Sequence, residues 1–174
     1  HRAGRSWWDR LRGRRPAPVR GLYLWGGPGR GKTYLVDRFF ECLPFGAKRR
    51  VHFHAFMQEV HARLQVLPKT PDPLRVIACE LAAQLRVLCI DEFHVSDIGD
   101  AMLLGGLLEA VFDQGITLVA TSNIPVDELY LEGLQRDRFL FAITLLKRHT
   151  TTIHLAGDED HRCRHLDRAG TYHP

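Results

Sequence analysis

The chain has 174 residues, 45% of them hydrophobic, and a net charge of +4. These values predict one domain with a full core, and they argue against a disordered chain. The four cysteines, at positions 42, 79, 89 and 163, form no C-x-x-C pair, which argues against a disulfide scaffold and favours a reducing compartment, the cytoplasm. Residues 101–112 are apolar but too short for a membrane span, and Glu109 interrupts them.

Residues 1–20 form a basic arm that contains seven of the 20 arginines and one acidic residue, Asp9. Such an arm is compatible with contact to nucleic acid, with peripheral association at an anionic membrane, or with a solvated entry into the fold. We expect the solvated arm, with weak, non-specific DNA binding at most and therefore no stable nucleic-acid complex. Because the chain begins with His1 and not with methionine, we expect a fragment of a longer protein, in which residues 1–19 are a basic leader or the remnant of an N-terminal segment.

The first predicted strand is the apolar run GLYLW at residues 21–25, and the sequence GGPGRGKT follows it at residues 26–33. This stretch fits G-x-x-x-x-G-K-[S/T], in which glycines let backbone N–H groups turn inward around phosphate oxygens, and a helix N-terminus adds its positive end. Lys32 would reach the outer phosphates, and the Thr33 hydroxyl would coordinate Mg²⁺. The predicted nucleotide-binding residues are Gly26, Gly27, Pro28, Gly29, Arg30, Gly31, Lys32 and Thr33.

A helix is predicted after this glycine-rich loop, and residues 50–56 then predict a second strand, on which His52 and His54 share a face. The spacing of apolar residues from Met57 to Leu67 predicts the next helix.

Asp72 and Pro73 are predicted to be the N-cap and the first residue of a further helix. Another helix is predicted to open at Ser96 or Asp97, and its glycine pair, residues 105–106, is expected to pack closely on the sheet. The remaining predicted elements are strands at residues 87–91, 116–122 and 150–155 and a helix at residues 138–148.

Strands separated by helices predict an α/β fold with a parallel sheet of five strands and helices on both faces. Ligands of such sheets bind beyond the carboxyl ends of the strands. Asp91 and Glu92 end the third strand: Asp91 is predicted to hold the Mg²⁺ shell and Glu92 to polarise a water for attack on the terminal phosphate, unless both begin a solvated loop. Asn123, after the fourth strand, would orient this water or contact the γ-phosphate, although asparagine is also a common turn residue.

Arg136 and Arg138 carry guanidinium groups suited to bidentate phosphate contacts. They lie well beyond Asn123 along the chain, so we expect them to reach the nucleotide of a neighbouring subunit, as arginine fingers do. The alternative is a surface salt bridge with Asp137. Two other groups, His52 with His54 and the set at positions 161, 163 and 165 (His, Cys, His), resemble metal ligands, but no further ligand cluster accompanies them, and we expect packing or hydrogen bonding there.

With these motifs the sequence resembles the AAA+ ATPases of the ZapE type, bacterial cell-division proteins with mitochondrial relatives. The resemblance runs from Arg20 to Pro174 and rests on GLYLWGGPGRGKT, RVHFHAFM, VLCIDEFHVSDIGDAMLLGGL, TLVATSNIP, ELYLEGLQRDRF and LLKRHT. Many NTPases share the P-loop, whereas HFHxFM, DEFxVSDIxDAM and GLQRxRF are much more specific.

The resemblance implies an AAA+ core over residues 20–174, a strand order of 5-1-4-3-2, ATP hydrolysis, and homo-oligomers that form rings or stacks. It also implies remodelling of FtsZ at the division site next to the inner membrane, and the mitochondrial relatives are associated with inner-membrane protein quality control. The matching segments are residues 26–33 for Walker A, Asp91 and Glu92 for Walker B, Asn123 for sensor 1, and Arg136 and Arg138 for the arginine-finger segment.

His94, Val126 and Phe141 depart from the family pattern. None of them handles phosphate, so we expect altered partner contacts or loop shape and retained hydrolysis. The chain ends where an AAA+ lid domain would begin and shows no sensor-2 arginine, so we expect the lid to be absent and nucleotide binding by this stretch alone to be weak.

Three functions are compatible with these features. The first is an ATPase that remodels a protein partner, the second is a P-loop kinase for a small acceptor, and the third is a DNA-associated ATPase similar to helicase loaders. A kinase needs neither arginines placed for a neighbour nor an Asp-Glu pair after the third strand. A loader predicts DNA binding with a steep salt dependence.

Overall fold

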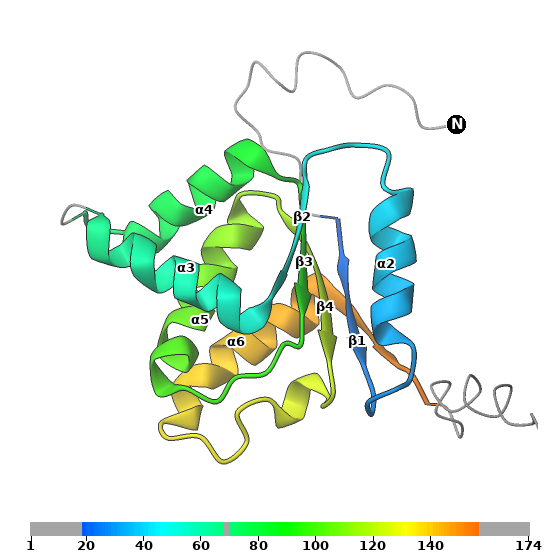
Figure 1. The fold of residues 1–174 in the computed structure, drawn as a ribbon. Helices are drawn as coiled ribbons and strands as arrows, with labels where there is room; N and C mark the ends of the chain where they lie inside the picture. Colours follow the sequence, from blue (N-terminus) through cyan, green and yellow to red (C-terminus); the bar gives the residue numbers. More distant parts are fainter. Residues whose placement is uncertain (1–18, 68–69, 157–174) are drawn as a thin grey trace, which may run out of the picture.

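The computed structural model describes residues 19–67 and 70–156 of the chain. Strands and helices alternate, as the sequence predicts (Figure 1). The strands are β1 (Gly21–Trp25), β2 (Lys48–His52), β3 (Val87–Asp91), β4 (Thr117–Ser122) and β5 (Thr150–His154). The helices are α2 (Lys32–Cys42), α3 (Phe53–Val66), α4 (Pro73–Gln84), α5 (Ile98–Asp113) and α6 (Arg136–His149), with the 3₁₀ turn η1 (Val126–Glu128).

The five strands form one parallel sheet in the order β2-β3-β4-β1-β5. This is the predicted order 5-1-4-3-2 read from the other edge, so the prediction is confirmed. Because β3, β4 and β1 are neighbours, the segments that follow them leave the same edge of the sheet side by side (Figure 1). That edge is where a parallel α/β sheet binds its ligands.

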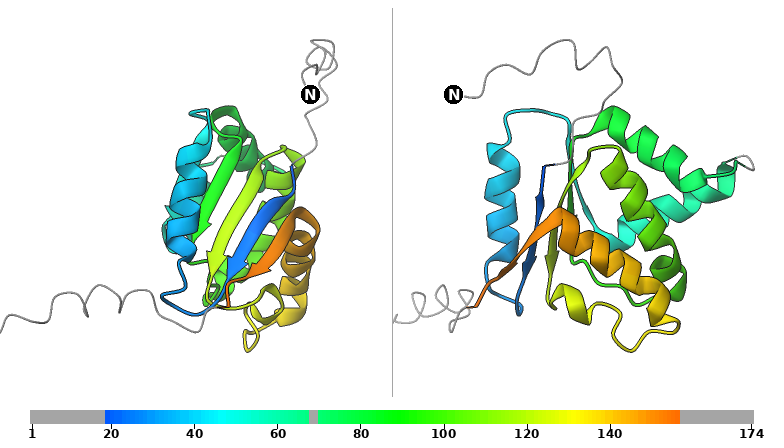
Figure 2. Two further views of the ribbon diagram at one scale, coloured as in Figure 1. Left: turned by 90° about the vertical axis from the view of Figure 1, so that its right-hand side faces the viewer. Right: turned by 180° about the vertical axis from the view of Figure 1, so that it is seen from behind.

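Helix α2 covers one face of the sheet, and α3, α4, α5 and α6 lie on the other (Figures 1 and 2). The larger core fills the space between the sheet and these four helices and includes Phe93, Leu104 and Leu146. The smaller core lies under α2 and contains Val36 and Cys89. Cys89 is fully buried there and packs as a small hydrophobic residue.

The second strand is shorter than predicted, and this part of the sequence prediction was wrong. β2 ends at His52, and α3 begins at Phe53, where a strand was expected to continue to residue 56. Phe53, Phe56, Met57 and Val60 are all buried and keep the i, i+3, i+4, i+7 spacing of a helix face. Burial of that face against the core outweighs the local alternation that suggested a strand.

Two helix starts agree with the sequence. The Asp72 carboxylate caps α4 by accepting from the Arg75 backbone N–H, and Pro73 is the first residue of that helix. Of the two predicted openings for α5, the structure selects Asp97, whose Oδ1 accepts from the backbone N–H groups of Gly99 (2.7 Å) and Asp100 (3.1 Å).

The glycine pair in α5 lies against helices and not against the sheet, which corrects the predicted contact. A Cβ atom added to Gly105 would lie 3.2 Å from Cδ1 of Phe141 in α6, and one added to Gly106 would lie 3.0 Å from Cδ1 of Leu74 in α4. The small residues therefore allow α5 to approach two helices closely. None of the helices in residues 19–67 and 70–156 combines the length and the apolar character that a membrane crossing requires.

Candidate functional site

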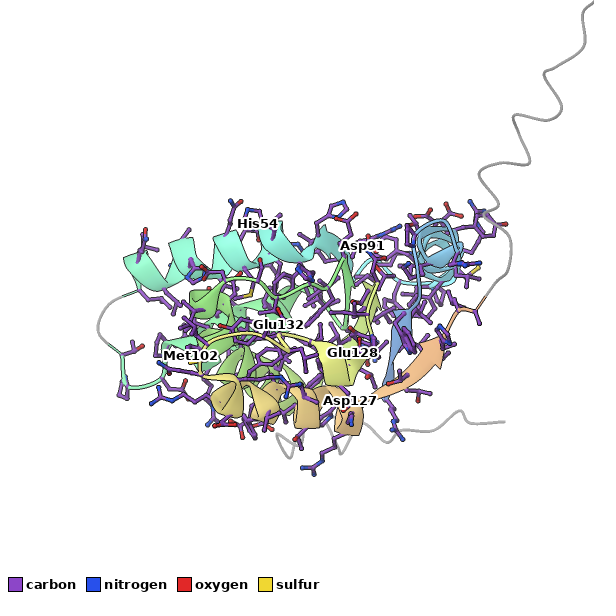
Figure 3. The ribbon with its side chains drawn as sticks, turned by 90° about the horizontal axis from the view of Figure 1, so that it is seen from below. His54, Asp91, Met102, Asp127, Glu128 and Glu132 are labelled. Atoms are coloured by element: carbon purple, nitrogen blue, oxygen red, sulfur yellow. The ribbon has the colours of Figure 1, made fainter. Side chains whose placement is uncertain are left out.

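A cavity of about 730 Å³ opens at the carboxyl edge of the sheet. Most of the predicted site residues line it: the loop from Pro28 to Thr33, Asp91 and Glu92 after β3, and Asn123 after β4. Figure 3 looks onto this edge from below, with Asp91 between α2 and α3. Three distant segments of the chain thus converge on one cavity.

The loop between β1 and α2 turns back sharply before the helix begins. Gly29 and Gly31 have positive φ angles of 76° and 78°, a backbone region that glycine occupies without strain. Nothing lies within 4 Å of a Cβ atom built on Gly31, so the loop is open at that point. The Lys32 side chain is buried, and its Nζ donates to the carbonyl oxygens of Gly26 (2.6 Å) and Gly27 (2.7 Å).

The residues of this loop fit a polyanion. Nη1 of Arg30 is buried and has no hydrogen-bond partner within the described part of the chain, and Arg30 lines the cavity. A buried donor without a partner is unfavourable, so a shift of the Arg30 side chain toward an anionic oxygen in the cavity would be favourable. The helix α2 begins at Lys32 with no side-chain cap, so its first N–H groups also face the loop.

Asp91 points toward α2 because side chains alternate along β3. Val87 and Cys89 pack in the core under α2, and Asp91, two residues further on, lies on the same face. The carboxylate is buried, and its Oδ1 accepts from the Thr121 hydroxyl at 3.2 Å. Thr121 Oγ1 also accepts from the Glu92 backbone N–H at 3.1 Å, so one residue of β4 orients both carboxylate-bearing residues.

Arg50 is a cavity residue that the sequence did not indicate. Its Nε donates to Oδ2 of Asp91 at 2.5 Å, and its Nη1 donates to Oδ1 of Asp37 in α2. Burial alone would lower the pKa of Arg50, but the hydrogen bonds and charges of Asp91 and Asp37 outweigh it, so the pKa is raised and the side chain stays a cation. The register of β2 against β3 brings Arg50 close to Asp91. This register cannot be predicted from a local sequence motif.

Glu92 follows Asp91 with a left-handed backbone, φ 54°. This conformation is unfavourable for residues with a Cβ atom and breaks the alternation of β3. The side chain is 80% exposed, and its Oε2 lies 3.8 Å from Nδ1 of His52. Asn123 and Thr33 are exposed as well. The side of the cavity that Thr33, Glu92 and Asn123 line is therefore open to solvent.

Arg136 and Arg138 are not among the residues that line this cavity. Both lie in the first turn of α6, where Nη2 of Arg136 donates to the carbonyl oxygen of Asp127 at 2.7 Å and Arg138 is exposed. Among the ion pairs of the described residues, none joins either arginine to Asp137. Their predicted action on a neighbouring subunit stays a prediction.

The histidines do not form a metal site in the described ranges. No group of three or more His, Cys, Asp or Glu side chains suited to a metal ion occurs there. His54 does not share a strand face with His52, because it lies in α3, where its Nε2 is 3.0 Å from Nε2 of Gln58. The second set, positions 161, 163 and 165, lies outside the described residues. A magnesium site of the predicted kind needs fewer protein ligands, since Mg²⁺ usually takes one or two carboxylates together with phosphate oxygens.

The family model of the AFG1-like ATPases matches residues 1–174. The chain belongs to this family. Cell division protein ZapE of Escherichia coli (strain K12) is 54% identical over 162 residues, which are 93% of this chain and 43% of that protein. Lactation elevated protein 1 homolog B of Danio rerio is 41% identical over 167 residues, 90% of this chain and 33% of that protein. The chain thus spans less than half the length of these relatives.

The AFG1-like chain also has the fold of solved P-loop proteins. Domain III of the Thermotoga maritima replication initiation protein DnaA matches with a TM-score of 0.60 and 18% identity, covering 88% of this chain and 61% of that one. At this identity the likeness shows the fold alone. Together with the family match, it confirms the predicted P-loop AAA+ core.

Proposed function

We propose that this chain binds ATP with magnesium in the cavity at the carboxyl edge of the sheet and hydrolyses it. The observation that supports this proposal best is the convergence of Lys32, the Asp91-Glu92 pair and Asn123 from three strand ends on one cavity. The membership of the AFG1-like ATPase family points to the same activity.

Each side chain has a task that its position allows. The backbone N–H groups of the loop and the Arg30 guanidinium donate to phosphate oxygens, and Lys32 turns from its carbonyl partners toward the outer phosphates. Thr33 and Asp91 would hold the magnesium ion, which supplies charge neutralisation for the triphosphate when bound. Glu92 accepts a proton from the attacking water, and the Asn123 amide orients that water.

The openness of the cavity favours hydrolysis at an interface between subunits. Thr33, Glu92 and Asn123 are all exposed, whereas a hydrolytic site works best when surrounding groups exclude bulk water. A second copy packed over this edge would close the site. We propose that Arg138 contacts the nucleotide bound by that second copy, where its guanidinium stabilises transition-state charge. Arg136, which also donates to the Asp127 carbonyl oxygen, lies in the same helical turn and has the same proposed role.

The work driven by hydrolysis is proposed from the relatives. ZapE of Escherichia coli is by name a cell division protein, and this chain is 54% identical to it. We therefore propose that the whole protein remodels a protein partner, FtsZ, at the division site, with residues 20–174 as the ATPase core and residues 1–19 as a basic leader.

The proposal is tested by replacing Glu92 with glutamine, which keeps the shape of the side chain and removes its basicity. We expect Glu92→Gln to bind a fluorescent ATP analogue as well as the wild type does, while its ATP turnover falls by about 10²- to 10⁴-fold. Glu109→Gln, at an exposed position of α5, is the matched control and should leave both quantities unchanged. Normal turnover by Glu92→Gln would remove this residue as the base, and absence of ATP binding by the wild type would refute the proposed function itself.

A further inference from the structure

Arg50 connects three elements beneath the nucleotide cavity. It projects from β2, contacts Asp91 at the end of β3, and contacts Asp37 in α2. The side chains of Arg50 and Asp91 are 21% and 10% exposed, so water screens their interaction poorly. The Asp37 side chain is 41% exposed, so the part of this ion-pair network that is shielded from solvent is the pair of Arg50 with Asp91.

The position of Asp37 relates this network to the cation site. Asp37 follows Thr33 by one helical turn, so the two residues lie on the same face of α2. Thr33 and Asp91 are the residues that we assign to magnesium, and Arg50 holds one of them directly. The guanidinium thus lies next to the place where a divalent cation would bind.

The charges decide what Arg50 does there. Oδ1 of Asp91 accepts from Thr121, and Oδ2 accepts from Arg50, so both carboxylate oxygens already have donors. A divalent cation that approaches Asp91 is repelled by the Arg50 cation and gains less from a carboxylate that is already neutralised. Without Arg50, Asp91 and Asp37 would be left as two carboxylates with no shared counter-ion.

We propose that Arg50 is the resident counter-cation of the nucleotide-free site, which keeps a divalent cation from binding before the nucleotide arrives. The guanidinium orients the Asp91 carboxylate through the hydrogen bond from Nε to Oδ2 and through the attraction between the two charges. The phosphates of the incoming nucleotide bring the additional negative charge that makes the site favourable for magnesium. This role rests on the proposed nucleotide-binding function, but it concerns the empty site and is measured there.

The test is the binding of Mn²⁺ alone, measured by electron paramagnetic resonance on the nucleotide-free chain. We expect Arg50→Gln to bind Mn²⁺ about tenfold more tightly than the wild type, because one nearby positive charge is removed. The gain should disappear in the double variant Arg50→Gln/Asp91→Asn, which shows that it uses Asp91. Arg49→Gln is the matched control, since Arg49 pairs with Glu59 in α3, on the opposite face of the sheet, and should bind Mn²⁺ as the wild type does.

Two outcomes would overturn the proposal. One is an Arg50→Gln variant that folds, as judged by circular dichroism, and binds Mn²⁺ no more tightly than the wild type. The other is a gain that survives the Asp91→Asn change. If Arg50→Gln does not fold, Arg50→Met decides, because it removes the charge and keeps a flexible, unbranched side chain that can fill the same space: a gain in Mn²⁺ binding supports the proposal and no gain overturns it. The Mn²⁺ measurements use the nucleotide-free chain, so they do not depend on whether the chain binds ATP. The role of Arg50 and the proposed ATPase function can therefore be refuted independently of each other.

Discussion

Asp91 and Arg50 depend on the same feature of the sheet, the alternation of side chains along a strand. Lys48 and Arg50 point toward α2, where Nζ of Lys48 donates to the carbonyl oxygens of Phe40 and Leu43. Arg49, between them, pairs with Glu59 on the other face. Two adjacent residues therefore have different roles: Arg50 lines the cavity, and Arg49 forms an exposed ion pair on the other face of the sheet.

Sequence reasoning found the cavity residues that stand in short motifs at strand ends. Lys32 follows a glycine pattern, and Asp91-Glu92 follow an apolar run, so position along the chain was enough to predict them. Arg50 and Thr121 could not be found in this way. Their roles depend on hydrogen bonds to residues on neighbouring strands, and strand register is a property of the packed sheet.

At the residue scale we also predict a difference in reactivity between two cysteines. Burial raises the pKa of the Cys89 thiol to about 11, whereas Cys42 is exposed on α2. At pH 8, Cys42 should react with a thiol reagent in the folded protein, and Cys89 should react only after unfolding, because the thiolate is the reactive form. Mass spectrometry of the labelled peptides measures both sites, and fast labelling of Cys89 in the native state would contradict the prediction.

The raised pKa of Cys89 has a consequence for stability with a definite sign. The folded state keeps the thiol protonated up to about pH 11, whereas the unfolded chain loses the proton near its ordinary value of 9.0. The contribution of the buried Cys89 thiol to the free energy of unfolding is therefore complete below pH 9, and it is lost as the pH rises from about 9 to 11. In Cys89→Ala this component of the alkaline decline in stability should be missing.

At the element scale, the boundary between β2 and α3 shows where sequence patterns compete. His52 and His54 alternate with Phe53, which is typical of a strand, but Phe53 is also the first residue of a buried helix face. Helical spacing extends over 14 residues and buries four apolar side chains on one face, whereas the predicted strand would have continued for only four more residues, 53–56. A pattern supported over a longer stretch should therefore be preferred when two periods overlap.

The N-cap of α5 offers a prediction about the stability of an element. The Asp97 carboxylate accepts two backbone N–H groups that have no partner inside the helix. We expect Asp97→Ala to lower the free energy of unfolding by about 1 kcal/mol and Asp97→Asn to retain most of it. Urea denaturation measures both values. An alanine variant as stable as the wild type would show that the cap contributes little.

At the scale of the whole molecule, the cavity and the arginines of α6 are separate features. Arg138 is exposed and does not line the cavity of its own chain, while the cavity is open at Glu92 and Asn123. A head-to-tail contact between copies, in which one surface of each subunit meets a different surface of the next, would bring these features together. Such a contact makes the activity a property of the assembly.

The last prediction tests this assembly by mixing two inactive variants. Lys32→Ala removes nucleotide binding from its own cavity but keeps Arg138, and Arg138→Ala keeps an intact cavity but lacks the arginine. Where the two variants alternate, the Lys32→Ala subunit supplies its arginine to the Arg138→Ala subunit, so ATP turnover should reappear in the mixture and peak near equal proportions. Wild-type turnover per subunit should also rise with protein concentration. A mixture of Lys32→Ala with the double variant Lys32→Ala/Arg138→Ala is the control, because no intact cavity is present in it. If no mixing ratio restores turnover while each variant still assembles in sedimentation, Arg138 does not act on a neighbouring subunit, and the open cavity must be completed by other residues.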